Sequence, residues 1–191
     1  MQGIEGVAQS LGCKIIKVTN PGTLDGGDVL KVGDTIYVGN SARTTKEGIK
    51  QLENAFKPAR TVSVDVTKVL HLKSAISALS DGTVLGWPQA VDDSKVFGKK
   101  YVEMPEEAGA HIVILDESTV LMGIAPKSAQ VLKDRGLNVI QVDISEFVKR
   151  EGCVTCLSVR VRELPSDSIY FSERENIDTK YALIHTQPAA V

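Results

Sequence analysis

A unit of hairpin, helix and strand recurs along this chain, and this repeat limits the possible folds more than any other feature. In the first copy, residues 28–32 and 35–38 alternate like two strands across a Gly-Asp turn. A Thr44-x-x-Glu47 capping box then predicts a helix, and residues 61–66 predict a third strand. The copies follow one another at roughly 40–46 residues, a period typical of one unit repeated around an axis or along a stack. The sequence therefore predicts an α/β protein of several similar ββαβ units.

Two further copies have the same order of elements. In the second, residues 71–79 and 83–87 form a predicted hairpin across Asp81-Gly82, and a weak helical pattern covers 89–97. In the third, strands at 112–115 and 119–122 precede a helix that begins at Pro126 and a strand at 138–142. The helix end and the strand that follows it at 11–18 resemble the helix end and strand at 135–142. The chain is therefore expected to begin partway through a unit. A fourth copy begins with a predicted strand around Cys156.

Equivalent places in these copies carry residues that can perform chemistry. Asp25, His71, the region near His111, and Cys156 each lie just before or inside the first hairpin strand. Copies related by rotation direct equivalent positions toward one axis, so we expect these residues to approach one another. A thiolate is a strong nucleophile, an imidazole transfers protons, and a carboxylate orients the imidazole. The pattern therefore predicts a nucleophilic site of Cys156, His71 and Asp25.

Each of these residues also has a structural interpretation. Cysteine is often buried and inert, although Gly152 and Ser158 suggest that Cys156 is open to a ligand. His71 lies between two leucines, as many core histidines do. Asp25 and Asp28 flank a Gly-Gly turn, and both carboxylates can accept hydrogen bonds from the backbone of such a turn.

The pair Cys153 and Cys156 has the Cys-x-x-Cys spacing of redox and zinc sites. A redox pair favours a helix N-terminus, whereas the residues around Cys156 favour a strand, and a structural zinc site needs a second ligand pair. The residues alone therefore favour neither a redox pair nor a structural zinc site, although both alternatives stay open.

Composition excludes several classes of protein. The hydrophobic content is 42%, the charged content 24% and the net charge −2, so no basic surface for nucleic acid or an anionic membrane is expected. No apolar run is long enough to span a membrane, and the first residues do not resemble a signal peptide. With three cysteines and no such signal, we expect reduced thiols and a cytoplasmic location.

Four motifs, in this order, resemble the dimethylarginine dimethylaminohydrolase family of the guanidino-group-modifying (pentein) superfamily. The motifs are Gly-Thr-Leu-Asp-Gly-Gly-Asp-Val-Leu at 22–30, Val-Gly-Asn-Ser-Ala-Arg-Thr at 38–44, Leu-His-Leu-Lys-Ser at 70–74 and Gly-Cys-Val-Thr-Cys-Leu-Ser-Val at 152–159. The resemblance covers residues 1–162 and implies a five-bladed α/β propeller of which about three blades are present. Residues 163–191 are polar, lack the repeat and are expected to form a C-terminal tail.

The resemblance also implies a reaction, in which dimethylarginine is hydrolysed at its guanidino carbon to citrulline and dimethylamine. By position in the motifs, Cys156 would be the nucleophile that carries a covalent S-alkylthiouronium, His71 the general acid and base, and Asp25 its acidic partner. Arg43 would bind the substrate α-carboxylate and Ser74 would line the site. No cofactor or metal is implied. Two alternatives stay open: an arginine deiminase or amidinotransferase relative, and a non-catalytic propeller fragment that acts as a binding or assembly module.

Two blades of the resembled fold have no counterpart before residue 1. They carry acidic residues and a second arginine that complete the substrate cage, so we expect a nucleophile with an incomplete cage. The expected partners are a small guanidino substrate and either further copies of this chain or a missing N-terminal segment, because an open propeller exposes strand edges. No nucleic acid or membrane partner is expected.

Overall fold

The structure is a computed structural model that describes residues 2–10 and 14–158. The chain divides into two compact units, Met1–Lys17 with Ser158–Val191, and Val18–Leu157. In the first unit, the structure describes the helix α1 (Gln2–Ser10) and an ion pair of 2.9 Å between Lys17 Nζ and Glu5 Oε1. The predicted tail from residue 163, and the boundary before it, lie outside the described residues.

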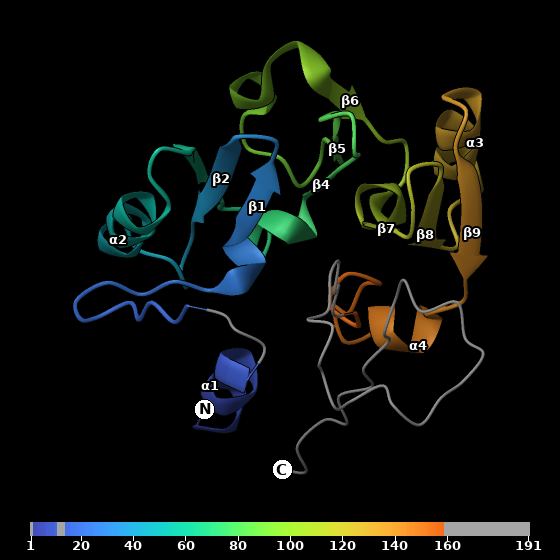
Figure 1. The fold of residues 1–191 in the computed structure, drawn as a ribbon. Coiled ribbons are helices and arrows are strands. Elements are labelled where there is room, and N and C mark those ends of the chain that lie inside the picture. The colour runs from blue at the N-terminus through green and yellow to red at the C-terminus, as the bar shows by residue number, and fades with distance from the viewer. Residues whose placement is uncertain (1, 11–13, 159–191) are drawn as a thin grey trace. The chain divides into compact units, whose positions relative to one another are not determined.

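Three separate sheets form the second unit, and all three have the same topology (Figure 1). In each, an antiparallel hairpin is extended by a third strand that runs parallel to the second, as when Val29 pairs with Val38 and Thr35 with Arg60. The α/β architecture of repeated ββαβ units that the sequence predicted is confirmed. The strands are β1 (Val29–Val32), β2 (Thr35–Asn40), β3 (Arg60–Asp65), β4 (Ile76–Ala78), β5 (Val84–Gly86), β6 (Tyr101–Glu103), β7 (Ile112–Ile114), β8 (Thr119–Gly123) and β9 (Asn138–Val142).

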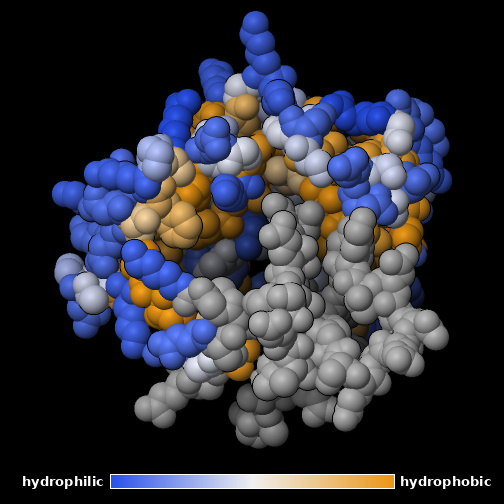
Figure 2. Space-filling view, in the orientation of Figure 1, coloured by the Kyte–Doolittle hydropathy of each residue, from blue (hydrophilic) through white to orange (hydrophobic). Residues whose placement is uncertain are grey.

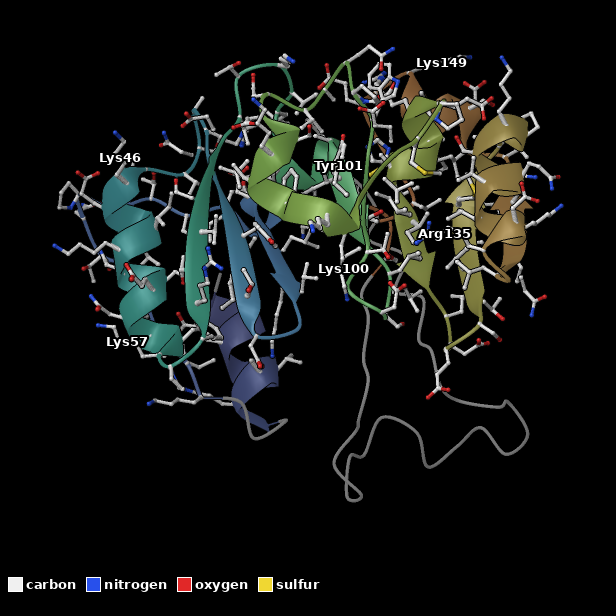
Figure 3. All side chains as sticks on the ribbon, turned by 90° about the horizontal axis from the view of Figure 1, so that it is seen from above. Lys46, Lys57, Lys100, Tyr101, Arg135 and Lys149 are labelled. Carbon is white, nitrogen blue, oxygen red and sulfur yellow. The ribbon has the colours of Figure 1, made fainter. Side chains whose placement is uncertain are left out.

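A parallel third strand requires a crossover connection, and helices supply it. The helix α2 (Lys46–Phe56) connects β2 to β3, and α3 (Pro126–Asp134) connects β8 to β9. Figure 3 shows Lys46 and Lys57 at the two ends of α2. In the second of the three repeats, the 3-10 segment η3 (Ser94–Lys100) connects β5 to β6 instead of an α-helix. The predicted helix at 89–97 is therefore wrong. The remaining short helices are η1 (Gly26–Asp28), η2 (Leu72–Ser74), η4 (Glu107–Ala110) and α4 (Ser145–Val148).

Two local predictions are also wrong. Helix α2 is capped by Thr45, whose hydroxyl accepts from Gly48 N at 3.2 Å, and not by Thr44, which is fully buried. The strand expected at 13–18 is absent from its described part, residues 14–18, and none of the described strands pairs with that segment. Without a pairing partner, an apolar segment has no ladder of hydrogen bonds to join.

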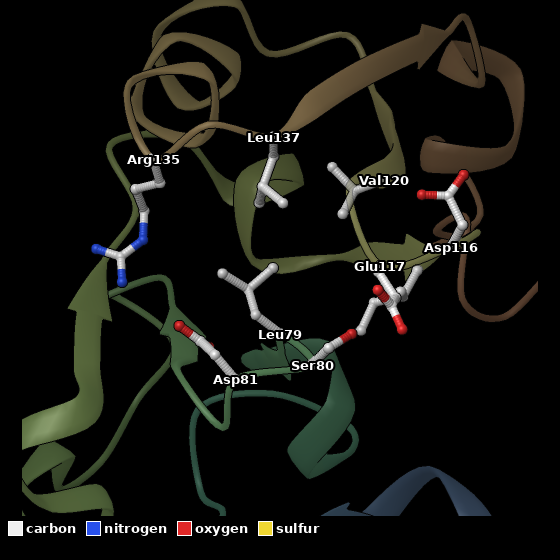
Figure 4. A pocket seen from close by; sticks show the side chains of 9 residues that line it. Leu79, Ser80, Asp81, Asp116, Glu117, Val120, Arg135 and Leu137 are labelled. Atoms are coloured by element: carbon white, nitrogen blue, oxygen red, sulfur yellow. The ribbon is translucent and has the colours of Figure 1, made fainter.

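Three apolar clusters form the core, and two of them join neighbouring sheets. One contains residues of β3, β4 and β5, and another contains residues of β5, β7 and β8. Exposed fractions fall to zero at Val38, Ile76, Leu85, Met122 and Leu132, which are central to these clusters. Between the second and third sheets, Leu79 and Val120 face one another across a small pocket of about 120 Å3 (Figure 4). Arg135 lies at the rim of this pocket and donates to Thr83 Oγ1 at 3.2 Å. None of the residues predicted for the nucleophilic site lines this pocket.

Several large apolar side chains remain exposed, and apolar patches interrupt the hydrophilic surface in Figure 2. Ile124 is 60% exposed and Phe56 54% exposed. Among the described helices, none is both long and apolar enough to cross a bilayer.

A buried carboxylate joins the first two sheets. Asp28 is 0% exposed, and its Oδ2 accepts from Ser41 Oγ and from Thr44 Oγ1, both at 2.7 Å. Its Oδ1 accepts from Leu72 N at 2.9 Å, 44 residues further along the chain. Thr44 Oγ1 in turn accepts from Asp25 N at 3.0 Å. One side chain therefore holds three loops in place.

Replacing Asp28 by asparagine is expected to lower the free energy of unfolding by about 2–4 kcal/mol, because an amide NH2 would face donors that are buried. Urea unfolding followed by circular dichroism measures the change. Asp65→Asn is the matched control, since Asp65 is exposed and accepts one bond from Asn40 Nδ2. The control should change the free energy by less than about 0.5 kcal/mol. Equal effects of both substitutions would contradict a structural role for the Asp28 carboxylate.

Candidate active site

Asp25 directly precedes the 3-10 turn η1 and uses both carboxylate oxygens. Oδ1 accepts from Gly27 N at 2.9 Å, and Oδ2 lies 3.2 Å from His71 Nε2. The bond from Gly27 is the main reason why the pKa of Asp25 lies below its usual value. Burial opposes that shift, while the charges of His71 and Arg43 add to it. Asp25 is therefore an anion at neutral pH.

His71 is held over the Gly26-Gly27 turn by the backbone around it. The residue is extended and caps η2, and its carbonyl accepts from Ser74 N at 3.0 Å. A β-carbon at Gly27 would lie 2.6 Å from the imidazole Cγ, so only glycine lets the ring come this close. Its Nε2 atom is buried and lies 3.2 Å from Asp25 Oδ2, without the alignment of a good hydrogen bond.

Arg43 and Ser74 approach this pair from two different loops. Arg43 is exposed, its backbone N donates to Ser41 Oγ at 3.0 Å, and its charge lowers the pKa of Asp25. Ser41 is bound to Asp28, so the loop that carries Arg43 depends on the same buried carboxylate. The Ser74 carbonyl accepts from His111 Nε2 at 2.7 Å, which requires a proton on Nε2 of this buried imidazole.

Cys156 lies in a helical turn, and the predicted strand is therefore wrong over residues 153–158. Cys156 N and Leu157 N both donate to Cys153 O, at 3.0 and 3.2 Å. The turn brings the two thiols together, with 3.1 Å between the Sγ atoms. Cys156 is exposed and Cys153 is buried. The β-branched residues between them favour a strand only where a neighbouring strand offers pairing.

The two thiols titrate differently. The pKa of Cys156 is lowered to about 5, mainly because the thiol of Cys153 donates to it. The Cys153 backbone and the charge of His111 act in the same direction, and burial opposes them. The pKa of Cys153 is raised, first because its proton is held in the bond to Cys156 and second because it is buried. Cys156 is therefore a thiolate at neutral pH.

The described contacts bring the predicted residues together in two groups. Asp25, His71 and Arg43 form one, and Cys156 lies in the other with Cys153 and His111. The turn of Ser74 connects them, because its nitrogen binds the His71 carbonyl and its carbonyl binds His111. Among the described residues, no hydrogen bond or ion pair joins His71 directly to Cys156.

Sequence reasoning missed the roles of Thr44 and Cys153. The hydroxyl of Thr44 connects Asp25 to Asp28, and its place in a Thr-Thr pair before the helix was the signal that could have assigned it.

Within residues 2–10 and 14–158, no group of three or more histidine, cysteine or acidic residues could hold a metal ion. The Cys153–Cys156 pair thus lacks further ligands in that part of the chain.

Comparisons with known proteins show which enzymes this chain is similar to. The chain is 55% identical over 165 residues to an N(G),N(G)-dimethylarginine dimethylaminohydrolase of Streptomyces coelicolor, which covers 85% of this chain and 64% of that protein. It is 33% identical over 153 residues to the protein of that name in Pseudomonas aeruginosa, with 77% and 59% coverage. No protein-family model matches the chain.

Solved structures show the same fold. The P. aeruginosa enzyme, as a mutant complexed with citrulline, aligns with a TM-score of 0.72 and 31% identity over 81% of this chain and 63% of that one. A cyanobacterial arginine dihydrolase domain aligns with a TM-score of 0.70 at 18% identity, over 80% and 62% of the two chains. The chain spans less than two thirds of the length of these relatives. It belongs to the guanidino-group-modifying (pentein) superfamily, in the group of the dimethylarginine dimethylaminohydrolases.

Proposed function

We propose that the chain carries the nucleophile and proton-transfer residues of a dimethylarginine dimethylaminohydrolase, which hydrolyses an N-methylated arginine to citrulline and a methylated amine. The observation that carries this proposal is the 55% identity to the Streptomyces enzyme over 165 residues, which cover 85% of this chain. The citrulline bound to the P. aeruginosa relative supports the choice of product.

The reaction begins with attack by the Cys156 thiolate on the guanidino carbon. A new S–C bond forms and the carbon becomes tetrahedral. The C–N bond to the methylated nitrogen then breaks, and His71 gives its proton to the departing amine. An S-alkylthiouronium remains on Cys156. His71 next takes a proton from water, the resulting hydroxide attacks the carbon, and citrulline leaves as the C–S bond breaks.

Asp25 would act through His71. Its carboxylate stabilises the imidazolium that must exist before amine departure and again after water is deprotonated. Arg43 would bind the α-carboxylate through its guanidinium. In support, Arg43 is exposed, and its charge lowers the pKa of Asp25. Ser74 lines the turn between the two groups of site residues.

A substrate panel tests the proposal. The chain is incubated with asymmetric dimethylarginine, monomethylarginine, arginine and an amidino acceptor, and citrulline, ammonia and methylated amines are quantified. Dimethylamine and citrulline are expected in equal amounts, and the incomplete cage predicts that they form slowly. Ammonia release from arginine as the preferred reaction would favour a deiminase, and amidino transfer would favour a transferase. If Cys156 reacts with 2-chloroacetamidine no faster than Cys13 does, the site is not assembled and the enzymatic proposal is wrong for this chain.

Asp25→Asn is expected to lower kcat/KM for dimethylarginine about a hundredfold while leaving stability nearly unchanged, because the amide oxygen still accepts from Gly27 but carries no charge to stabilise an imidazolium. Citrulline formation against pH measures the loss, and urea unfolding measures stability. His71→Ala should lose about a thousandfold. Asp65→Asn is the surface control for both measurements. Full activity of Asp25→Asn would exclude the carboxylate from proton transfer.

Removing the Cys153 thiol is expected to raise the pKa of Cys156. In a Cys13→Ser background, iodoacetamide should alkylate Cys156 at nearly constant rate from pH 8 down to pH 6, because its pKa of about 5 keeps it ionised there. In Cys153→Ala the alkylation rate at pH 6 should fall by about tenfold for each unit by which the pKa of Cys156 rises above 6, because the thiolate fraction falls by that factor. Cys153→Ser keeps a hydroxyl donor and should lose less. Identical profiles for all three proteins would show that Cys153 does not stabilise the thiolate.

A further inference from the structure

The two thiols of the turn at 153–156 differ in their exposure to solvent, which decides which of them an oxidant can reach. Cys156 is exposed, and Cys153 is buried with a relative exposure of 6%. Their sulfur atoms are 3.1 Å apart, and Cys153 Sγ also lies 3.0 Å from Thr155 Oγ1. The arrangement therefore has one thiol that solvent oxidants can reach and a second that is shielded but in contact with the first.

The backbone already supports a bond between these sulfurs. Cys156 N and Leu157 N both donate to Cys153 O, which closes a single helical turn across the Cys-x-x-Cys spacing. A disulfide has an S–S length of about 2.05 Å, so the sulfurs need to approach by roughly 1 Å, within the reach of two χ1 rotations. Helical Cys-x-x-Cys turns are the usual setting of reversible dithiols.

We propose that Cys153 and Cys156 form a reversible disulfide when a hydroperoxide oxidises Cys156, which makes this turn an oxidative modification site. Cys156 sulfur attacks one peroxide oxygen, the O–O bond breaks, and the leaving hydroxide takes a proton to become water. Cys156 is now a sulfenic acid, oxidised by two electrons. Cys153 sulfur then attacks Cys156 sulfur, the S–O bond breaks, and the departing hydroxide takes the Cys153 proton as water.

The first step also prepares the second. While Cys156 is a thiolate, it holds the Cys153 proton and keeps Cys153 from acting as a nucleophile. Sulfenic acid formation removes that negative charge, and the main cause of the raised pKa of Cys153 disappears with it. The buried thiol is thus released only after its neighbour has been oxidised. An excess of small thiol or dithiol restores both cysteines by exchange.

The bond would withdraw the sulfur that the proposed hydrolysis needs, and it would protect that sulfur from irreversible oxidation. A sulfenic acid without a nearby thiol proceeds to sulfinic and sulfonic acid, which cellular thiols do not reverse. The inference is separate from the hydrolase proposal, because disulfide formation is read from mass and needs no turnover.

The experiment uses the whole chain in a Cys13→Ser background with a few equivalents of hydrogen peroxide at pH 7. Cleavage after Arg150 and Arg160 releases one peptide, residues 151–160, that contains both cysteines. We expect this peptide to lose about 2 Da and to regain it with dithiothreitol. Cys153→Ser should instead gain about 32 Da at Cys156, at least about tenfold more than the protein with both thiols, and dithiothreitol should not remove it. Cys156→Ser should leave Cys153 reduced.

Three results would overturn the proposal. Cys156 could reach sulfinic acid at the same rate with and without Cys153, which would mean that the pair does not close. The 151–160 peptide could remain reduced under conditions that fully oxidise free glutathione. With Cys13 restored, Cys156 could pair with Cys13 in preference to Cys153. Citrulline formation, measured before and after peroxide, is a separate readout, so loss of one proposal leaves the other to be judged on its own data.

Discussion

The buried carboxylate of Asp28 is the interaction on which the arrangement of the candidate site depends. It accepts hydrogen bonds from the loop that carries Arg43, from Thr44 beneath Asp25, and from Leu72 next to His71. A buried charge is costly unless such donors surround it, so each loop has a strong reason to stay where it is. The first two sheets are thereby joined at the place where Asp25 and His71 meet.

The repeated architecture could be predicted from sequence because the strands, turns and helix starts of each repeat have local sequence signals. Alternating strands, the Asp81-Gly82 turn and Pro126 at a helix start are all read within about ten residues, and the three sheets confirm them. The errors arose where local pattern was ambiguous or a partner was needed. Thr44 and Thr45 are both good caps, and only the position of Asp28 decides between them. Residues 14–18 include the β-branched Ile15, Ile16 and Val18, which favour a strand, but none of the described strands pairs with them.

For the candidate site, sequence indicated which residues belong together but not how they contact one another. The Asp25–His71 contact follows from equivalent positions in two copies of the repeat, and its 3.2 Å separation agrees with that expectation. The thiol pair did not follow, because β-branched residues at 154–155 favour a strand and only tertiary context shows the turn. His111 donates to the Ser74 carbonyl, and its charge lowers the pKa of Cys156. Both interactions depend on side-chain positions that no spacing rule predicts.

The close approach of Gly27 to His71 has a consequence for how this site can vary. The imidazole lies against main-chain atoms, and a β-carbon there would be 2.6 Å from Cγ. On this side, the position of the ring is therefore limited by main-chain atoms and not by a side chain that substitution could shorten or remove. Side chains at other places around the ring can vary while this boundary stays the same, as long as residue 27 remains glycine.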